Sequence, residues 1–233
     1  MRRPFLLLKS VDMNERTWTE VDAYVAERLA PRDADLEAAQ LAAADAGLPA
    51  ISVSPLQGKM LSLLATMTGA RRILEIGTLG GYSTLWLAWA LPIGGHILTL
   101  EADPKHAEVA RANFRRAGLE AAIELRLGRA LDTLPKLAAE NPQPFDLFFI
   151  DANKDDIPDY FQWALKLGRK GSVIVVDNVV RGGNILDAGS ADANVRGVRR
   201  FYDMLAKEPR VSATAIQTVG LKGYDGFALA VIV

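Results

Sequence analysis

From Arg72 onward, short apolar runs alternate with longer helical patterns, and this alternation restricts the fold more than any other feature of the chain. The fourth and fifth runs are almost continuously hydrophobic, as are strands buried on both faces of a sheet. The pattern predicts an α/β fold with a doubly wound, mostly parallel sheet. The expected strands are residues 72–76, 96–100, 122–127, 145–150 and 172–176, and the expected helices are 80–90, 104–117, 129–140 and 157–167.

The two ends of the chain follow other patterns. Residues 178–194 read as a loop and 195–207 as a helix, and two strands at 211–218 and 226–233 predict an antiparallel hairpin joined by 219–225. These strands complete a seven-stranded sheet. The first 70 residues contain three helical patterns, in which Thr17 and Glu20 suggest a capping box and Pro31 an end of the first helix. We therefore expect one domain, 1–233, with 1–70 as a helical N-terminal extension.

Composition narrows the possible partners. The 27 Lys and Arg residues balance 28 Asp and Glu, so a net charge of −1 gives no general attraction for nucleic acid. Cysteine is absent and only His96 and His106 are present, both expected to be structural, so a metal must be held by oxygen. The apolar run at 5–8 is too short for a signal peptide and no stretch could span a membrane, which predicts a cytoplasmic protein.

A glycine-rich turn follows the first strand. Leu79 stands where a dinucleotide fingerprint requires its second glycine, so pyrophosphate binding is not indicated. Glu75 would repel a pyrophosphate but could attract the cationic amino acid part of a sulfonium cofactor, which favours S-adenosylmethionine. Glu101 ends the second strand about 24 residues beyond Gly77, where a carboxylate can accept hydrogen bonds from a ribose diol.

Two buried strands each end in aspartate. Asp151 follows one strand, and Asp177 with Asn178 follows the next. Because the ends of parallel strands meet at one edge of the sheet, these side chains can converge as three oxygen donors, a set that suits Mg²⁺. A single strand-end aspartate would more often cap a helix, but two with an adjacent asparagine favour a metal site.

Four segments in order, residues 52–58, 74–84, 150–154 and 175–178, resemble the cation-dependent O-methyltransferases of the catechol and caffeoyl-CoA type. The resemblance implies a Rossmann-like class I methyltransferase fold, S-adenosylmethionine, Mg²⁺ and a homodimer. It also implies a role for each matching residue. The cofactor contacts would be Val53, Glu75, Gly77, Thr78, Ser83, Glu101, Ala130 and Asp151, the metal ligands would be Asp151, Asp177 and Asn178, and Lys154 would be the general base beside Asp151.

The implied function is methyl transfer to a hydroxyl of a catechol-like or phenolic small molecule. Lys154 would accept the phenol proton, which a bound divalent cation makes easier to remove. Asn153 replaces an aspartate that is common in the family, which leaves a catalytically silent S-adenosylmethionine-binding protein as an alternative. Arg196, Arg199 and Arg200 form a basic cluster, with Arg181 upstream, that could be a solvated helix face or could contact an anionic acceptor such as a CoA phosphate or an RNA loop. The cluster leaves a second alternative, methylation of a hydroxyuridine in tRNA.

Overall fold

The computed structural model describes residues 13–30 and 32–233, so Pro31 and the apolar run at 5–8 lie outside the described residues. A seven-stranded sheet has the order β3-β2-β1-β4-β5-β7-β6. Its first five members are parallel, and β7 is antiparallel to both β5 and β6. The strands are β1 (Arg72–Ile76), β2 (His96–Glu101), β3 (Ile123–Leu127), β4 (Phe145–Ile150), β5 (Gly168–Asp177), β6 (Val211–Gly220) and β7 (Gly223–Ile232). The predicted fold class is confirmed.

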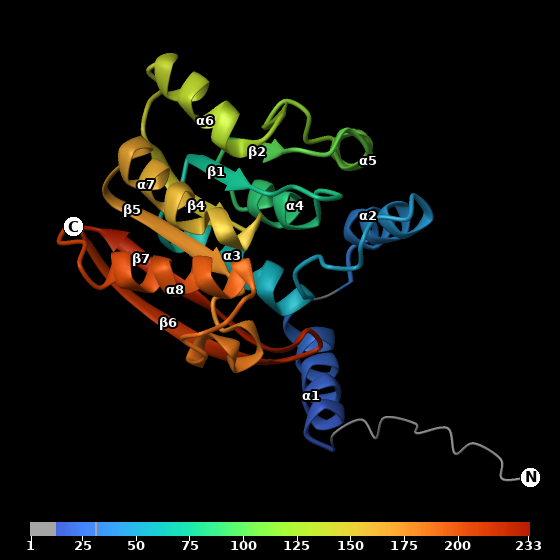
Figure 1. The fold of residues 1–233 in the computed structure, drawn as a ribbon. Helices are drawn as coiled ribbons and strands as arrows, with labels where there is room; N and C mark the ends of the chain where they lie inside the picture. Colours follow the sequence, from blue (N-terminus) through green and yellow to red (C-terminus); the bar gives the residue numbers. More distant parts are fainter. Residues whose placement is uncertain (1–12, 31) are drawn as a thin grey trace, which may run out of the picture.

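Helices cover both faces of the sheet (Figure 1). Neighbouring strand residues alternate between the two layers: Phe148 packs with α6, α7 and α8, whereas Phe149 packs with α3, α4 and α5. The helices are α1 (Met13–Leu29), α2 (Ala34–Asp45), α3 (Pro55–Met67), α4 (Tyr82–Trp89), α5 (Pro104–Arg116), α6 (Ala130–Ala139), α7 (Ile157–Leu167) and α8 (Ala193–Leu205), with short 3₁₀ helices η1 (Lys154–Asp156) and η2 (Arg181–Leu186). Among the described residues, no helix is both long enough and hydrophobic enough to cross a lipid bilayer.

Two local predictions were wrong. The C-terminal hairpin turns at residues 221–222 rather than 219–225, because Gly220 pairs with Gly223 and Gly223 adopts a φ of 79° that favours a tight turn. Helix α1 begins at Met13, so Thr17 lies inside the helix rather than at its cap. Glu20 instead accepts a hydrogen bond from Arg16 at 2.8 Å, one helical turn away.

The capped start of α3 fixes the conformation of the chain segment that contains Val53, a residue assigned to the cofactor site from the sequence. Ser54 accepts a hydrogen bond from the Gln57 backbone N–H, and the Gln57 side chain accepts one from the Ser54 N–H, which makes a complete capping box. Pro55 occupies the first turn, where its missing N–H has no cost. Val53 directly precedes this cap and is buried.

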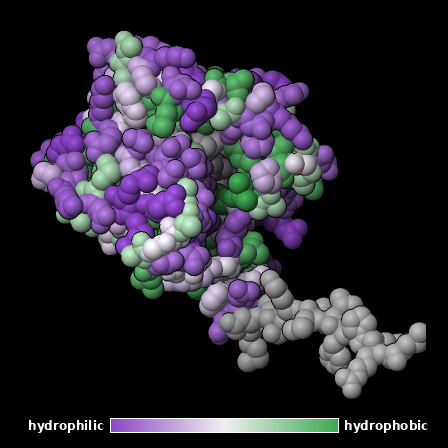
Figure 2. Space-filling view, viewed as in Figure 1, coloured by the Kyte–Doolittle hydropathy of each residue, from purple (hydrophilic) through white to green (hydrophobic). Residues whose placement is uncertain are grey.

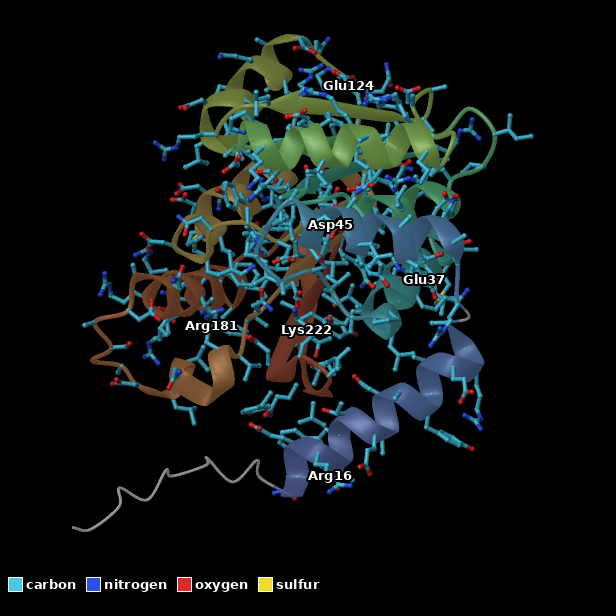
Figure 3. The ribbon with its side chains drawn as sticks, turned by 90° about the vertical axis from the view of Figure 1, so that its right-hand side faces the viewer. Arg16, Glu37, Asp45, Glu124, Arg181 and Lys222 are labelled. Carbon is cyan, nitrogen blue, oxygen red and sulfur yellow. The ribbon has the colours of Figure 1, made fainter. Side chains whose placement is uncertain are left out.

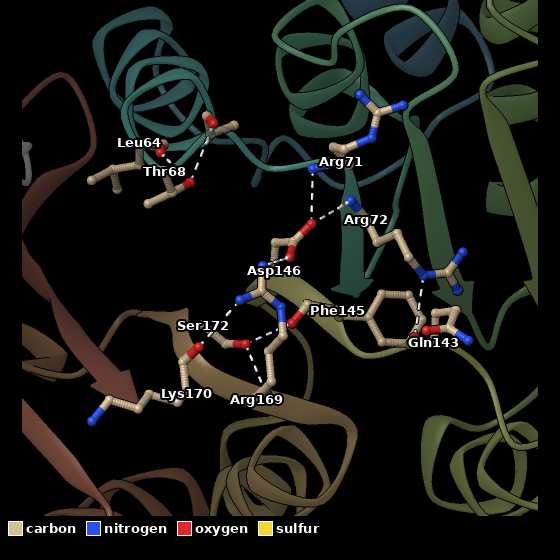
Figure 4. Close-up of polar contacts among 11 residues, drawn as sticks. Leu64, Thr68, Arg71, Arg72, Gln143, Phe145, Asp146, Arg169, Lys170 and Ser172 are labelled. Carbon is tan, nitrogen blue, oxygen red and sulfur yellow. Dashed lines mark hydrogen bonds and ion pairs between the residues drawn. The ribbon is translucent and has the colours of Figure 1, made fainter. Parts of the chain in front are cut away.

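Asp146 joins the starts of three strands (Figure 4). Its Oδ2 accepts hydrogen bonds from the backbone N–H groups of Arg71 and Arg72 at 2.9 and 3.0 Å, and its Oδ1 accepts one from Arg169 at 2.6 Å. Burial raises the pKa of the Asp146 carboxyl, but these hydrogen bonds outweigh burial and leave the pKa below its ordinary value. This ionised carboxylate joins the starts of β1, β4 and β5, at the edge of the sheet opposite the polar strand ends.

Candidate active site

A cavity of about 600 Å³ opens at the edge of the sheet where the parallel strands end. Ligand sites of doubly wound sheets lie outside this edge. Most of the residues assigned to a site from the sequence line the cavity, whereas Glu75 and Asp177 are not among its lining residues. The lining members of the predicted set are Val53, Gly77, Thr78, Ser83, Glu101, Ala130, Asp151, Lys154 and Asn178.

The turn after β1 lies directly against the end of β4. Gly77 has a φ of 101°, and a Cβ added there would lie 2.2 Å from the backbone oxygen of Asp151. The Asp151 N–H donates to the Ile76 oxygen at 2.9 Å, which holds the two strand ends together. Glycine is therefore required for both its conformation and its lack of a side chain. The close approach brings the cofactor turn and Asp151 to one side of the cavity.

Glu101 is held in one orientation by backbone donors. Its Oε2 accepts hydrogen bonds from the N–H groups of Thr78 and Leu79 at 3.2 and 2.8 Å. Its Oε1 accepts from Ala102 and Asp103, both at 2.9 Å. The carboxylate at the end of β2 thereby joins the glycine turn after β1, and both line the cavity.

Glu75 is fully buried and bonds to hydroxyl groups rather than facing the cavity. Ser83 donates to its Oε1 at 2.6 Å, and Thr84 and Thr99 donate to its Oε2 at 2.5 and 2.7 Å. Burial raises the pKa of Glu75 to about 7, the three hydroxyl donors oppose the rise, and the charge of Asp151 adds to it. Ser83 does line the cavity, so its hydroxyl joins the buried Glu75 carboxylate to the cavity wall.

Lys154 and Asp151 form a close ion pair. The Lys154 Nζ lies 2.5 Å from Asp151 Oδ1, and Lys154 is only 8% exposed. The chain turns into η1 directly after β4, so the three-residue spacing brings both side chains to the cavity. A buried amine beside a carboxylate at the mouth of a ligand cavity can hold or move a proton.

Asp177 and Asn178 extend this polar group to the end of β5. Asp177 is 7% exposed and accepts a hydrogen bond from the Asn178 N–H at 2.8 Å. Burial raises the pKa of Asp177, the negative charge of Asp151 raises it further, and Lys154 and the Asn178 N–H oppose the shift. Two carboxylates that repel each other fit a site for a divalent cation. Among the described residues no cluster of three His, Cys, Asp or Glu side chains suits a metal, so the candidate set depends on the Asn178 amide.

Several cavity residues were not assigned to the site from the sequence. His106 was expected to be structural and without a carboxylate partner, but it lines the cavity with Nδ1 3.5 Å from Glu101 Oε1. Its position five residues after Glu101, in the first turn of the next helix, was the available signal. Arg129, Tyr160 and Arg181 also line the cavity. His96 has a carboxylate neighbour as well, Glu124 at 3.5 Å.

The arginines of the basic cluster form hydrogen bonds with neighbouring loops of the protein. Arg196 donates to the backbone oxygens of residues 190 and 191, and Arg199 donates to the oxygen of Ile185. Arg200 binds both the backbone oxygen and the carboxylate of Asp155. Through these contacts the guanidinium groups on one face of α8 stabilise the loops before the helix and the η1 segment.

Comparison with known proteins identifies the family. A sequence profile of the O-methyltransferase family matches residues 31–231. A protein of Niastella koreensis named catechol O-methyltransferase is 52% identical over 220 residues, covering 94% of this chain and all of that protein. A Mycobacterium tuberculosis protein of the same name is 54% identical over 213 residues, covering 91% and 95%.

A solved structure shows the same architecture. The O-methyltransferase from Bacillus cereus in complex with SAH is 57% identical, with a TM-score of 0.92 and coverage of 94% of this chain and 99% of that one. Sequence and structure thus agree over nearly the whole chain. The resemblance inferred from the four sequence segments is confirmed, and the chain belongs to the O-methyltransferase family and is an enzyme of that class.

Proposed function

We propose that the enzyme transfers the methyl group of S-adenosylmethionine to one hydroxyl of a catechol-like small molecule, with Mg²⁺ or another divalent cation bound beside the acceptor. The observation that carries the proposal is the meeting of Asp151, Lys154 and Asn178 at one cavity, with Asp177 near enough for its charge to interact with Asp151 and Lys154. Relatives named catechol O-methyltransferase, at 52% and 54% identity, support the acceptor class. SAH in the Bacillus cereus structure, the demethylated form of the donor, supports the cofactor.

The cofactor side of the cavity lies over β1, β2 and the start of α6. Glu101 would accept hydrogen bonds from the ribose hydroxyls, and its four backbone donors keep its oxygens in place. Ser83 and Asp151 would receive the cofactor amine, with Gly77 and Thr78 against the methionine part. Ala130 begins α6, where backbone N–H groups are free of helical partners and can bind an adenine acceptor atom. Val53 would close the cavity from the segment before α3.

The acceptor side holds the proposed cation. Asp151, Asp177 and Asn178 would be its ligands, an all-oxygen set of the kind that Mg²⁺ favours. When bound, such an ion supplies positive charge that stabilises a phenolate over a phenol. The Asn153 side chain donates to Asp156 at 2.9 Å, so its replacement of an aspartate leaves the three ligands intact.

Methyl transfer breaks the sulfur–methyl bond and forms an oxygen–methyl bond, so the donor sulfur keeps the bonding electron pair and becomes neutral. The acceptor hydroxyl must lose its proton. Lys154, with Nζ beside Asp151, is the group we assign as the proton acceptor, and it must be a neutral amine when it takes the proton. Alignment of oxygen, methyl and sulfur by the cavity walls would supply a large part of the rate enhancement.

One assay tests the proposal. The enzyme is incubated with labelled S-adenosylmethionine and a panel of catechols, phenolic CoA esters and tRNA, with and without EDTA. We expect methylation of catechols that EDTA abolishes and added Mg²⁺ restores. The Asp151→Ala variant should lose activity with its fold intact. Full activity in EDTA would contradict the metal assignment, and no methylation of any acceptor would leave a silent binding protein.

The described contacts favour the small-molecule acceptor over tRNA. Three of the arginines that motivated an RNA partner, Arg196, Arg199 and Arg200, bind backbone oxygens and Asp155. In the assay above, labelling of tRNA but not of catechols would reverse this choice.

We also propose a homodimer in the cytoplasm. Large apolar side chains are exposed on the N-terminal helices, with Tyr24 at 60% and Leu29 at 63% on α1 and Leu41 at 64% on α2. Figure 2 shows hydrophobic residues gathered on the side of the molecule that carries α2. Burying such a surface is a common reason for association. Light scattering should give the mass of two chains, and a Leu41→Glu substitution should shift it toward one.

A further inference from the structure

Arg181 lines the cavity, and the proposed reaction does not use its charge. It follows Asn178 by three residues and begins η2. Its Nε is shielded from solvent and has no hydrogen-bond partner among the described residues. None of the ion pairs found within residues 13–30 and 32–233 includes the Arg181 guanidinium. Arg181 as a whole is half-buried at the cavity wall, and none of the hydrogen bonds found among the described residues uses its side chain. An anion in the cavity would therefore supply acceptors that the exposed part of the guanidinium lacks.

The backbone of Arg181 is held in place for this role. Asp225 Oδ1 accepts hydrogen bonds from the N–H groups of Val180, Arg181 and Gly226, at 2.9, 3.0 and 2.9 Å. Arg181 has a φ of 56°, a conformation that costs energy for any residue with a side chain. Figure 3 shows it at the turn between β5 and α8, well away from α1 and α2. The strained position is thus fixed by the Asp225 carboxylate rather than by contacts of the guanidinium.

Sheet order places Arg181 on the acceptor side of the cavity. Arg129, the other arginine of the lining, follows β3, whereas Arg181 follows β5. Four strand spacings separate β3 from β5, or about 19 Å. The Cα atoms of Asn178 and Arg181 are at most about 11 Å apart, because a chain extends by no more than ~3.6 Å per residue. Arg181 is therefore next to the proposed metal ligands and remote from the proposed adenine contact.

We propose that Arg181 selects catechols that carry a carboxylate on the ring or on a short side chain. The planar guanidinium matches a carboxylate in two parallel hydrogen bonds. The cavity of about 600 Å³ must hold the cofactor as well, which favours a single-ring acid over a larger anion such as a CoA ester. The inference rests on the proposed function and specifies that the catechol acceptor is negatively charged.

A matched pair of acceptors isolates the charge: 3,4-dihydroxybenzoate and its methyl ester. We expect the enzyme to prefer the acid, with the acid-to-ester ratio of kcat/KM falling about 10- to 100-fold in Arg181→Gln, mainly through KM, because a hydrogen-bonded charge pair is lost. Arg181→Lys should restore part of the ratio. Arg115→Gln removes the same charge from an exposed position on α5 and should leave the ratio unchanged. Thermal unfolding of each variant checks the fold.

The outcomes separate the two proposals. A wild-type preference for the ester, or an acid-to-ester ratio that Arg181→Gln does not change, would overturn the role of Arg181 while methylation continues. A phenolic CoA ester that outcompetes the acid and depends on Arg181 would assign the residue to phosphate instead and would also overturn it. Absence of methylation with every catechol would remove the proposed function and this inference together.

Discussion

The Lys154 Nζ lies 2.5 Å from Asp151 Oδ1, so one ion pair joins the candidate base to a candidate metal ligand. The side chains of both residues are largely shielded from solvent, at 10% and 21% exposure, which strengthens their interaction relative to a surface pair. A change at either residue therefore alters the charge that surrounds the other.

Replacing Lys154 with methionine should lower kcat by about 10²- to 10⁴-fold, the usual contribution of a general base, with a smaller effect on KM. The variant should regain activity as the pH rises, because more acceptor is then ionised in solution. Steady-state rates from pH 6 to 10 measure this. Lys170→Met, at an exposed position, is the control and should match the wild type. A kcat within threefold of wild type would show that Lys154 is not the base.

Gly77→Ala should weaken cofactor binding and stability, because the new Cβ would lie 2.2 Å from the Asp151 oxygen and the turn must shift. Gly171→Ala is a matched control: Gly171 has a similar φ of 88°, but nothing lies within 4 Å of its added Cβ. Both variants carry backbone strain of about 1 kcal/mol. Calorimetry with S-adenosylhomocysteine should show a loss of affinity of at least tenfold for Gly77→Ala only. Equal affinities in the two variants would refute the close-approach argument.

The sequence predicted which strand ends bring polar side chains to the cavity edge, because that information is local. The change from an apolar run to Asp151 or Asp177 marks a strand end, and sheet order brings such ends together. Helix α7 has the predicted bounds for the same reason. His106, Tyr160 and Arg181 were missed as cavity residues because helical periodicity and loop composition do not specify which distant element a side chain faces. The position of Glu75 behind Ser83 depends in the same way on hydroxyls from two other elements.

Glu75 predicts a pH dependence of stability. Its pKa in the folded protein is about 7, above the ordinary value of 4.5, so the folded state binds the extra proton more tightly than the unfolded state. This contribution is complete below pH 4.5 and is lost as the pH rises through 7. Glu75→Gln should therefore flatten the decline of the melting temperature between pH 5 and 8, whereas Glu20→Gln on exposed α1 should not. An unchanged slope in Glu75→Gln would show that Glu75 is ionised throughout this range.

Asp146 should stabilise the fold without affecting chemistry. Asp146→Ala leaves the N–H groups of Arg71 and Arg72 without their acceptor, and we expect a loss of about 1–3 kcal/mol in the free energy of unfolding. Asp146→Asn retains an acceptor oxygen and should lose less, and Asp203→Ala, at an exposed position of α8, should lose almost nothing.

The pH dependence of the Asp146 contribution has the opposite sign to that of Glu75. The pKa of Asp146 is below its ordinary value of 3.8, so its stabilisation is complete above that pH and is lost as the pH falls through the folded-state value. Urea unfolding at pH 7 and pH 3 should show the difference between wild type and Asp146→Ala shrinking at the lower pH. A difference that stays constant or grows on acidification would mean that the ionised carboxylate is not what joins β1, β4 and β5.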